Sequence, residues 1–127
     1  MIPHLFLESG PATGSAEPVV TAYDICLPAN AAVCAALGGV GHGTVTPVAP
    51  DRGLPRNFFI PLATIDEYYD FLFHWTHVSP DEFEEALNRA GALDPGSPSF
   101  AYWATLEWFR ALEGMGHSVR VTVGFGE

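Results

Sequence analysis

The chain has 127 residues and a formal net charge of −10 at pH 7, because fifteen acidic residues face five arginines and no lysine. Nucleic-acid phosphates are neutralised by lysine and arginine, so this composition argues against direct nucleic-acid binding. A Walker-type phosphate loop and Schiff-base chemistry both need a lysine and are excluded. The length and the 48% of hydrophobic residues predict a single folded domain over residues 1–127.

The sequence shows no membrane or export signal. The first residues, Met1 to His4, lack the basic stretch and apolar core of a signal peptide, and the apolar runs are too short to span a bilayer. We therefore expect a cytoplasmic protein that does not bind membranes, present as a monomer or a small homo-oligomer. Cys26 and Cys34 are interpreted as a reduced, buried pair with a structural role, because neither lies in a known nucleophile signature.

The first half of the chain combines strand patterns with one short helix. Two strand-like segments precede Pro28, and Gly38-Gly39 stops an alanine-rich helix. The glycines up to Gly43 follow a helix instead of a strand, so they predict a tight turn and not a nucleotide-binding loop. The expected elements are, in order, a strand over 2–8, a loop over 9–17, a strand over 19–27, a helix over 29–37, and strands over 44–48 and 57–62.

Three helices with clear start signals follow. The segments that begin at Thr64 and at Ser79 have the capping-box pattern, in which a hydroxyl and a glutamate each accept from the other's backbone N–H. Ser97-Pro98 opens the third helix, and Gly114 closes it. The expected helices span about 64–78, 80–91 and 98–113, and a last strand spans 119–125.

This order of elements predicts an α+β fold. The economical arrangement is one mostly antiparallel sheet of four to five strands, covered on one face by three main helices. The strict alternation over 119–125 indicates a strand with one buried face, so the other face of the sheet is expected to meet solvent. The C-terminal strand has to return into the sheet beside earlier strands.

The expected helix 64–78 is apolar over more than half of its circumference, which places it at the centre of the helical layer. Its polar side chains fall on one stripe, formed by Asp66, Glu67, Asp70, His74 and His77. Within it Asp70, His74 and His77 are spaced i, i+4 and i+7, and two imidazoles with a carboxylate suit Zn²⁺ or Fe²⁺. The alternative is a solvated helix edge without metal, because a His-x-x-His pair alone is a weak signature.

Acidic residues are concentrated on two of the expected helices. No arginine lies between Asn57 and Asn88, so these carboxylates have no counter-charges nearby in the sequence. Such a surface attracts basic partners and raises association rates, whereas the alternative is an ordinary solvated face. The acidic residues expected to contact a partner are Asp66, Glu67, Asp70, Asp81, Glu84 and Glu85.

The expected helix 98–113 carries aromatic residues on two sides. Phe100 and Trp103 fall near Glu107 and Arg110, opposite the main apolar face. A tryptophan beside an arginine is typical of a binding hot spot if it is exposed, whereas aromatic residues at helical spacing are more often core. Phe100 and Trp103 are therefore candidate anchors for a partner, with burial as the alternative.

Together these patterns favour a small acidic, non-enzymatic protein without a cofactor. We expect it to bind and occlude a basic surface of a nucleic-acid-handling protein, as an immunity protein, an antitoxin, or a phage-encoded inhibitor of a defence nuclease with an anti-CRISPR-like role. Two alternatives stay open. One is a small metal-dependent or ligand-binding enzyme that uses Asp70, His74 and His77, and the other is a structural subunit of a phage or secretion assembly.

Overall fold

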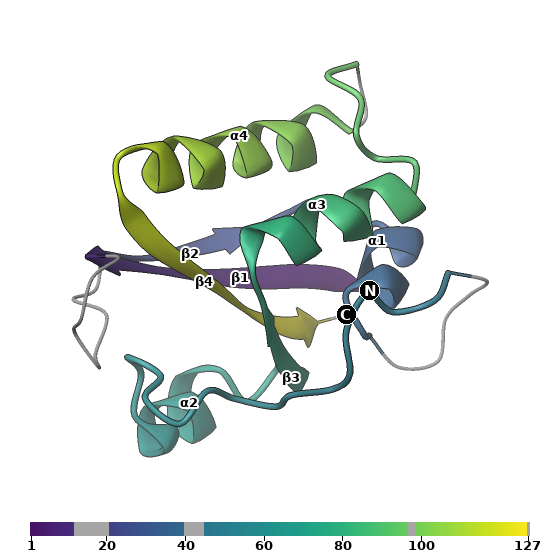
Figure 1. Cartoon of the computed structure of the whole chain (residues 1–127). Helices are drawn as coiled ribbons and strands as arrows, with labels where there is room; N and C mark the ends of the chain where they lie inside the picture. The colour runs from purple at the N-terminus through teal and green to yellow at the C-terminus, as the bar shows by residue number, and fades with distance from the viewer. Residues whose placement is uncertain (12–20, 40–44, 97–98, 127) are drawn as a thin grey trace.

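A computed structural model describes residues 1–11, 21–39, 45–96 and 99–126, and it confirms the α+β fold. Within those residues four strands form one antiparallel sheet in the order β2-β1-β4-β3, accompanied by four helices (Figure 1). The elements are β1 (Ile2–Pro11), β2 (Thr21–Cys26), α1 (Ala31–Ala36), α2 (Leu62–Tyr68), β3 (Phe73–Val78), α3 (Pro80–Arg89), α4 (Phe100–Gly114) and β4 (His117–Gly126).

The C-terminal strand returns to the middle of the sheet, as expected. β4 lies between β1 and β3 and pairs with β1 over its whole length, from Ile2 opposite Gly126 to Pro11 opposite His117. The two ends of the chain therefore lie side by side (Figure 1). None of the helices in the described ranges is long and apolar enough to cross a membrane.

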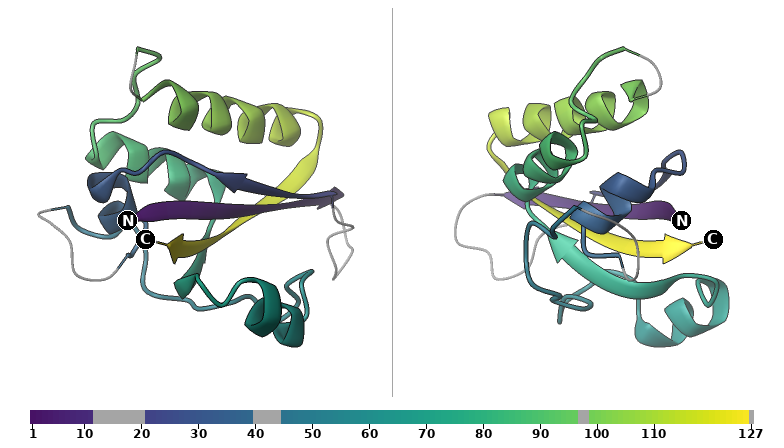
Figure 2. Two further views of the ribbon diagram at one scale, coloured as in Figure 1. Left: turned by 180° about the vertical axis from the view of Figure 1, so that it is seen from behind. Right: turned by 90° about the vertical axis from the view of Figure 1, so that its right-hand side faces the viewer.

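The sheet is covered on both faces, so the expected one-sided layer is wrong. α1, α3 and α4 lie on one face, whereas α2 and residues 54–61 before it lie on the other (Figures 1 and 2). On the first face Leu5 and Leu7 of β1 join Phe83 of α3 and Phe109 of α4 in one buried cluster. Hydrophobic burial against these helices is the main stabilising term on this face.

Aromatic side chains fill the second face. The fully buried ring of Phe6 lies 5.7 Å from the ring of Phe58, 5.2 Å from that of Tyr69 and 5.4 Å from that of Trp75, measured between centroids. Residues of β4 from Val121 to Gly126 are all buried as a result. The alternation of β4 predicts a solvent-open face, and this prediction is wrong because a local pattern does not show which distant segment covers the strand.

The expected helix 64–78 is wrong in its second half. α2 begins at Leu62 directly after Pro61, so the capping box at Thr64 does not form, and α2 ends at Tyr68. The residues Phe73–Val78 form an edge strand, with an irregular register between Phe73 and Thr76 and a positive φ of 54° at His74. Aromatic and β-branched side chains favour a pleated surface, and this preference overrides a helical pattern that is apolar over more than half of its circumference.

The strands expected at 44–48 and 57–62 are also wrong: residues 45–61 contain no strand. Prolines at 47, 50, 55 and 61 interrupt the segment, and proline cannot donate to a strand ladder. Parts of other expected elements lie outside the described residues: the loop beyond Pro11, the start of the 19–27 strand, the glycines after Gly39, Thr44 and the Ser97-Pro98 helix start.

The start of α3 matches its prediction in atomic detail. The Ser79 hydroxyl accepts a hydrogen bond from the Glu82 backbone N–H at 3.2 Å, and the Glu82 carboxylate accepts from the Ser79 N–H at 3.0 Å. Pro80 occupies the first helical position, where no N–H is needed. The helix expected at 29–37 is present as α1, capped by the side chain of Asn30, and α4 ends at Gly114 as expected.

Gly124 allows the second layer to approach the sheet. A Cβ atom at this position would lie 3.1 Å from Cδ1 of Leu72 and 3.1 Å from two carbons of the Trp75 ring. Gly124→Ala is therefore expected to lower the free energy of unfolding by about 1–3 kcal/mol through overpacking. Gly114→Ala is the matched control, because nothing lies within 4 Å of its added Cβ. Urea unfolding should show Gly114→Ala at or slightly above wild-type stability, and equal losses at both positions would contradict the packing.

The Glu82 carboxylate also accepts two hydrogen bonds from Arg52, at 2.6 and 2.7 Å. These bonds are the main reason that the pKa of Glu82 falls from 4.5 to about 2. A carboxyl whose pKa falls on folding stabilises the protein above its unfolded pKa, and this contribution is lost as the pH drops from about 4.5 to about 2.

Glu82→Gln is therefore expected to destabilise the protein near neutral pH and to do so progressively less as the pH falls through that window. Urea unfolding of wild type and variant at several pH values measures the difference. Glu107→Gln is the control, because Glu107 is exposed on α4 and has no ion pair with a residue that the structure describes. A constant penalty for Glu82→Gln down to about pH 2 would contradict the assignment.

Candidate protein-binding surface

The acidic residues of α3 are largely matched by arginines. Arg110 of α4 lies 2.7 Å from a carboxylate oxygen of Asp81, 3.4 Å from one of Glu84 and 2.8 Å from one of Glu113. Glu85 pairs with Arg89 at 3.0 Å. The hydrogen bonds to Asp81 and Glu113 are the main reason that the pKa of Arg110 is raised. Asp81 and Glu84 thus link α3 to α4 through Arg110, and the α3 carboxylates are not the uncompensated surface that the sequence suggested.

The acidic residues of α2 and of the turn after it, which are together called the α2 carboxylates, have no such partners. Asp66, Glu67 and Asp70 are exposed, and none forms an ion pair with a residue in the described ranges. α2 also lies across the sheet from α3 (Figure 2). The expectation of one negative surface spread over two neighbouring helices is therefore wrong, and only the α2 half of it remains uncompensated.

Exposed apolar side chains accompany the α2 carboxylates. Leu62 and Tyr68, the first and last residues of α2, each keep 65% of their surface exposed. The candidate anchors on α4 lie on the other side of the sheet (Figure 1). There Phe100 is 56% exposed and Trp103 half-buried, with their ring centroids 6.0 Å apart. The structure thus does not bring the two predicted anchors together with the α2 carboxylates.

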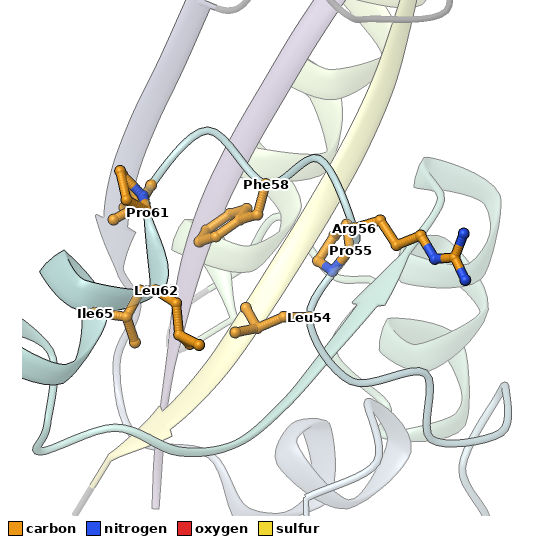
Figure 3. Close-up of a pocket in the computed structure, with 8 residues that line it drawn as sticks. Leu54, Pro55, Arg56, Phe58, Pro61, Leu62 and Ile65 are labelled. Atoms are coloured by element: carbon orange, nitrogen blue, oxygen red, sulfur yellow. The ribbon is translucent and has the colours of Figure 1, made fainter.

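A cavity of about 300 Å³ opens between α2 and the segment that precedes it. In Figure 3 the side chains of Leu54, Phe58 and Leu62 converge on this space, while the guanidinium of Arg56 points away from it. The buried side chain of Ile65 also lines it. The walls are therefore mostly apolar, and Asp66 lies near the edge of the cavity, since it follows Leu62 by one helical turn.

We call this region the α2 surface, defined as the cavity together with Leu62, Tyr68, Asp66, Glu67 and Asp70. An apolar recess with a charged rim is the usual composition of a protein-binding site. Comparison with protein-family models, curated proteins and solved structures finds no match for this chain. The chemistry of the surface is therefore the basis on which a function can be argued. The sequence does not indicate the cavity, because the pattern over 57–62 predicts a strand where the structure has an irregular wall segment.

The expected metal site on helix 64–78 does not form, because the helix that would carry its three ligands ends at Tyr68. Asp70 lies in a turn, and both histidines lie on β3. His74 faces Asp51 at 3.6 Å, whereas His77 lies opposite Thr122 of β4. Among the residues that the structure describes, no three His, Cys, Asp or Glu side chains are grouped to hold a metal ion. The metal-dependent alternative thereby loses its structural basis.

A buried ion pair fixes the wall of the cavity to the sheet. Glu8 is fully buried on β1, and both of its carboxylate oxygens accept hydrogen bonds from Arg120 on β4, at 2.9 and 2.8 Å. Arg120 also donates to the side-chain oxygen of Asn57 at 2.6 Å. Burial, followed by the charges of Arg52 and Arg120, lowers the pKa of the neighbouring His77. Sequence patterns do not reveal this pair, although a glutamate inside an apolar strand is a usable signal of a buried charge.

Proposed function

We propose that this chain is a non-enzymatic binding protein whose α2 surface docks onto a basic surface of a partner protein. The observation that carries the proposal is a mostly apolar cavity of about 300 Å³ against α2, whose exposed carboxylates and that of the following turn form no ion pair within the described ranges. An apolar side chain of the partner would enter the cavity. Lysine or arginine residues of the partner would pair with Asp66, Glu67 and Asp70.

Charge complementarity supports a basic partner. Arg52, Arg89, Arg110 and Arg120 each pair with a carboxylate. The fifth arginine, Arg56, lines the cavity, and three carboxylates against this one guanidinium leave the α2 surface negative. A negative surface steers diffusing cationic partners and raises association rates at low salt. At 0.1 M salt such attraction is largely screened beyond about 10 Å, so the association rate is expected to depend strongly on ionic strength.

The size of the cavity favours a side chain over a separate ligand. Pockets for small molecules usually measure about 300–1,000 Å³, and this one lies at the lower limit. Nucleic-acid-handling proteins have basic working surfaces, which makes them the class of partner that fits best. An immunity protein, an antitoxin or a phage-encoded inhibitor of a defence nuclease, acting in the cytoplasm, would occlude such a surface in this way.

A matched pair of variants tests the proposal. Leu62→Asp places a charge at the mouth of the cavity, and Phe100→Asp makes the same change at a similarly exposed residue on the opposite side. Affinity capture from the native host, followed by binding measurements with the purified partner, should show loss of binding for Leu62→Asp alone. Equal retention by both variants, or binding that does not respond to salt, would refute the proposal.

A further inference from the structure

A second cavity, of about 250 Å³, lies where β1, β2 and β4 meet the turn after α2. It is separate from the cavity of the α2 surface and shares no residue with it. It is lined by Ile2, His4, Cys26, Phe71, Leu72 and Gly126. A thiol and an imidazole therefore share one largely apolar recess.

The sheet register places these two groups together. Cys26 lies directly opposite His4 in the antiparallel pair of β1 and β2. Directly opposed residues project from the same face of a sheet, with Cβ atoms about 4.5–5.5 Å apart. Cys26 is a free, exposed thiol, so the expectation of a buried pair of cysteines is wrong for this residue. Cys34 is free and buried, as expected.

Asp24 orients the imidazole. Its carboxylate pairs with Nε2 of His4, and the His4 ring stacks on Phe6 at 5.3 Å between centroids. The rings of Tyr69 and Phe71 lie 6.4 and 6.0 Å from that of His4. When one imidazole nitrogen donates to a carboxylate, the other nitrogen of the neutral ring is the acceptor. Nδ1 of His4 is therefore the nitrogen that can accept a proton.

We propose that Cys26 is a nucleophilic thiol that accepts an acyl group from an activated ester or thioester, with His4 as its base and Asp24 as the residue that positions His4. A bond forms between Sγ of Cys26 and the carbonyl carbon, and the bond from that carbon to the leaving oxygen or sulfur breaks. The thiol proton passes to Nδ1 of His4 and then to the leaving group or solvent. The apolar walls of Ile2, Phe71 and Leu72 hold the acyl group.

This arrangement has the three parts that activate a nucleophile: the thiol, an adjacent base, and a third group that orients the base. It does not depend on the proposed protein-binding function. Cys34 serves as an internal comparison for Cys26, because burial raises the pKa of the Cys34 thiol to about 11. A thiol that stays protonated reacts slowly with electrophiles, so acylation should be confined to Cys26.

The probe for the test is p-nitrophenyl acetate. Wild-type protein should release one equivalent of p-nitrophenolate in a rapid phase, and mass spectrometry should locate one acetyl group on Cys26. Cys26→Ala should abolish this phase, and Cys34→Ala should leave it unchanged. His4→Gln should slow acylation by about 100-fold, the usual loss when a general base is removed. Thermal unfolding checks that each variant is folded.

If His4→Gln does not fold, Asp24→Asn takes its place, because the Asp24 side chain is 43% exposed. It should slow acylation by about tenfold or more, and Asp24→Glu should recover much of the rate, which a purely structural effect would not produce. The proposal is overturned if Cys26 is acetylated no faster than free N-acetylcysteine. It is equally overturned if a folded variant that lacks the base or its positioning carboxylate reacts like wild type.

Discussion

Arg120→Ala is expected to lower the free energy of unfolding by about 3–5 kcal/mol, the usual result of removing one partner from a buried ion pair. The substitution would leave the Glu8 carboxylate, which is 0% exposed, without its counter-charge. It would also release Asn57 and with it the segment that walls the cavity of the α2 surface. Urea unfolding at neutral pH measures the loss.

Two controls separate the buried charge from general damage. Arg56→Ala removes an exposed arginine from the same segment, so the free energy of unfolding should change by less than about 0.5 kcal/mol. In the double variant Glu8→Met/Arg120→Met the pair is replaced by apolar side chains, and much of the stability should return. A loss below about 1 kcal/mol for Arg120→Ala would mean that Glu8 is solvated and that the pair does not fix the segment.

Neutralising the α2 carboxylates is expected to slow association with the partner by about tenfold at low salt and to flatten its salt dependence. The variant is Asp66→Asn/Glu67→Gln/Asp70→Asn, measured by surface plasmon resonance or stopped flow over a range of ionic strengths. The carboxylates act at long range, so the association rate should change more than the dissociation rate.

The matched control changes the net charge by the same amount elsewhere. Asp81→Asn/Glu84→Gln/Glu85→Gln removes three carboxylates from α3, where Arg110 and Arg89 already pair with them. If the location of the charge matters, this variant should associate nearly as fast as wild type. Equal slowing by the two triple variants would show that only net charge counts, and the α2 surface would lose its special role.

The elements that the sequence predicted well have strong local signals. The Ser79 capping box with Pro80 fixes the start of α3, and the alternation around Val121 identifies β4 as a strand. The prediction of a helix over 64–78 failed because the apolar residues there fit a helical period as well as the pattern of a strand. The choice between the two depends on pairing with β4. That pairing is a tertiary contact, which a local pattern does not contain.

The candidate site could be predicted only in part, for a related reason. The sequence shows where the carboxylates are, but Arg110 reaches Asp81 across 29 positions and Arg120 reaches Glu8 across 112. Such pairs decide which acidic residues are neutralised, and they form only when distant elements meet. The cavity beside Leu62 likewise depends on an irregular segment between prolines, whose path no periodicity predicts.

In the proposed complex the partner docks on the α2 surface and not on the opposite side of the sheet. The most direct test replaces Tyr68, or in a control Phe100, with the photo-crosslinking residue p-benzoylphenylalanine, since both are exposed aromatic residues. The account predicts a crosslink from position 68 to a basic surface of the partner, weakened by high salt, and none from position 100. A crosslink from position 100 alone, or from position 68 to an acidic or neutral surface, would contradict it.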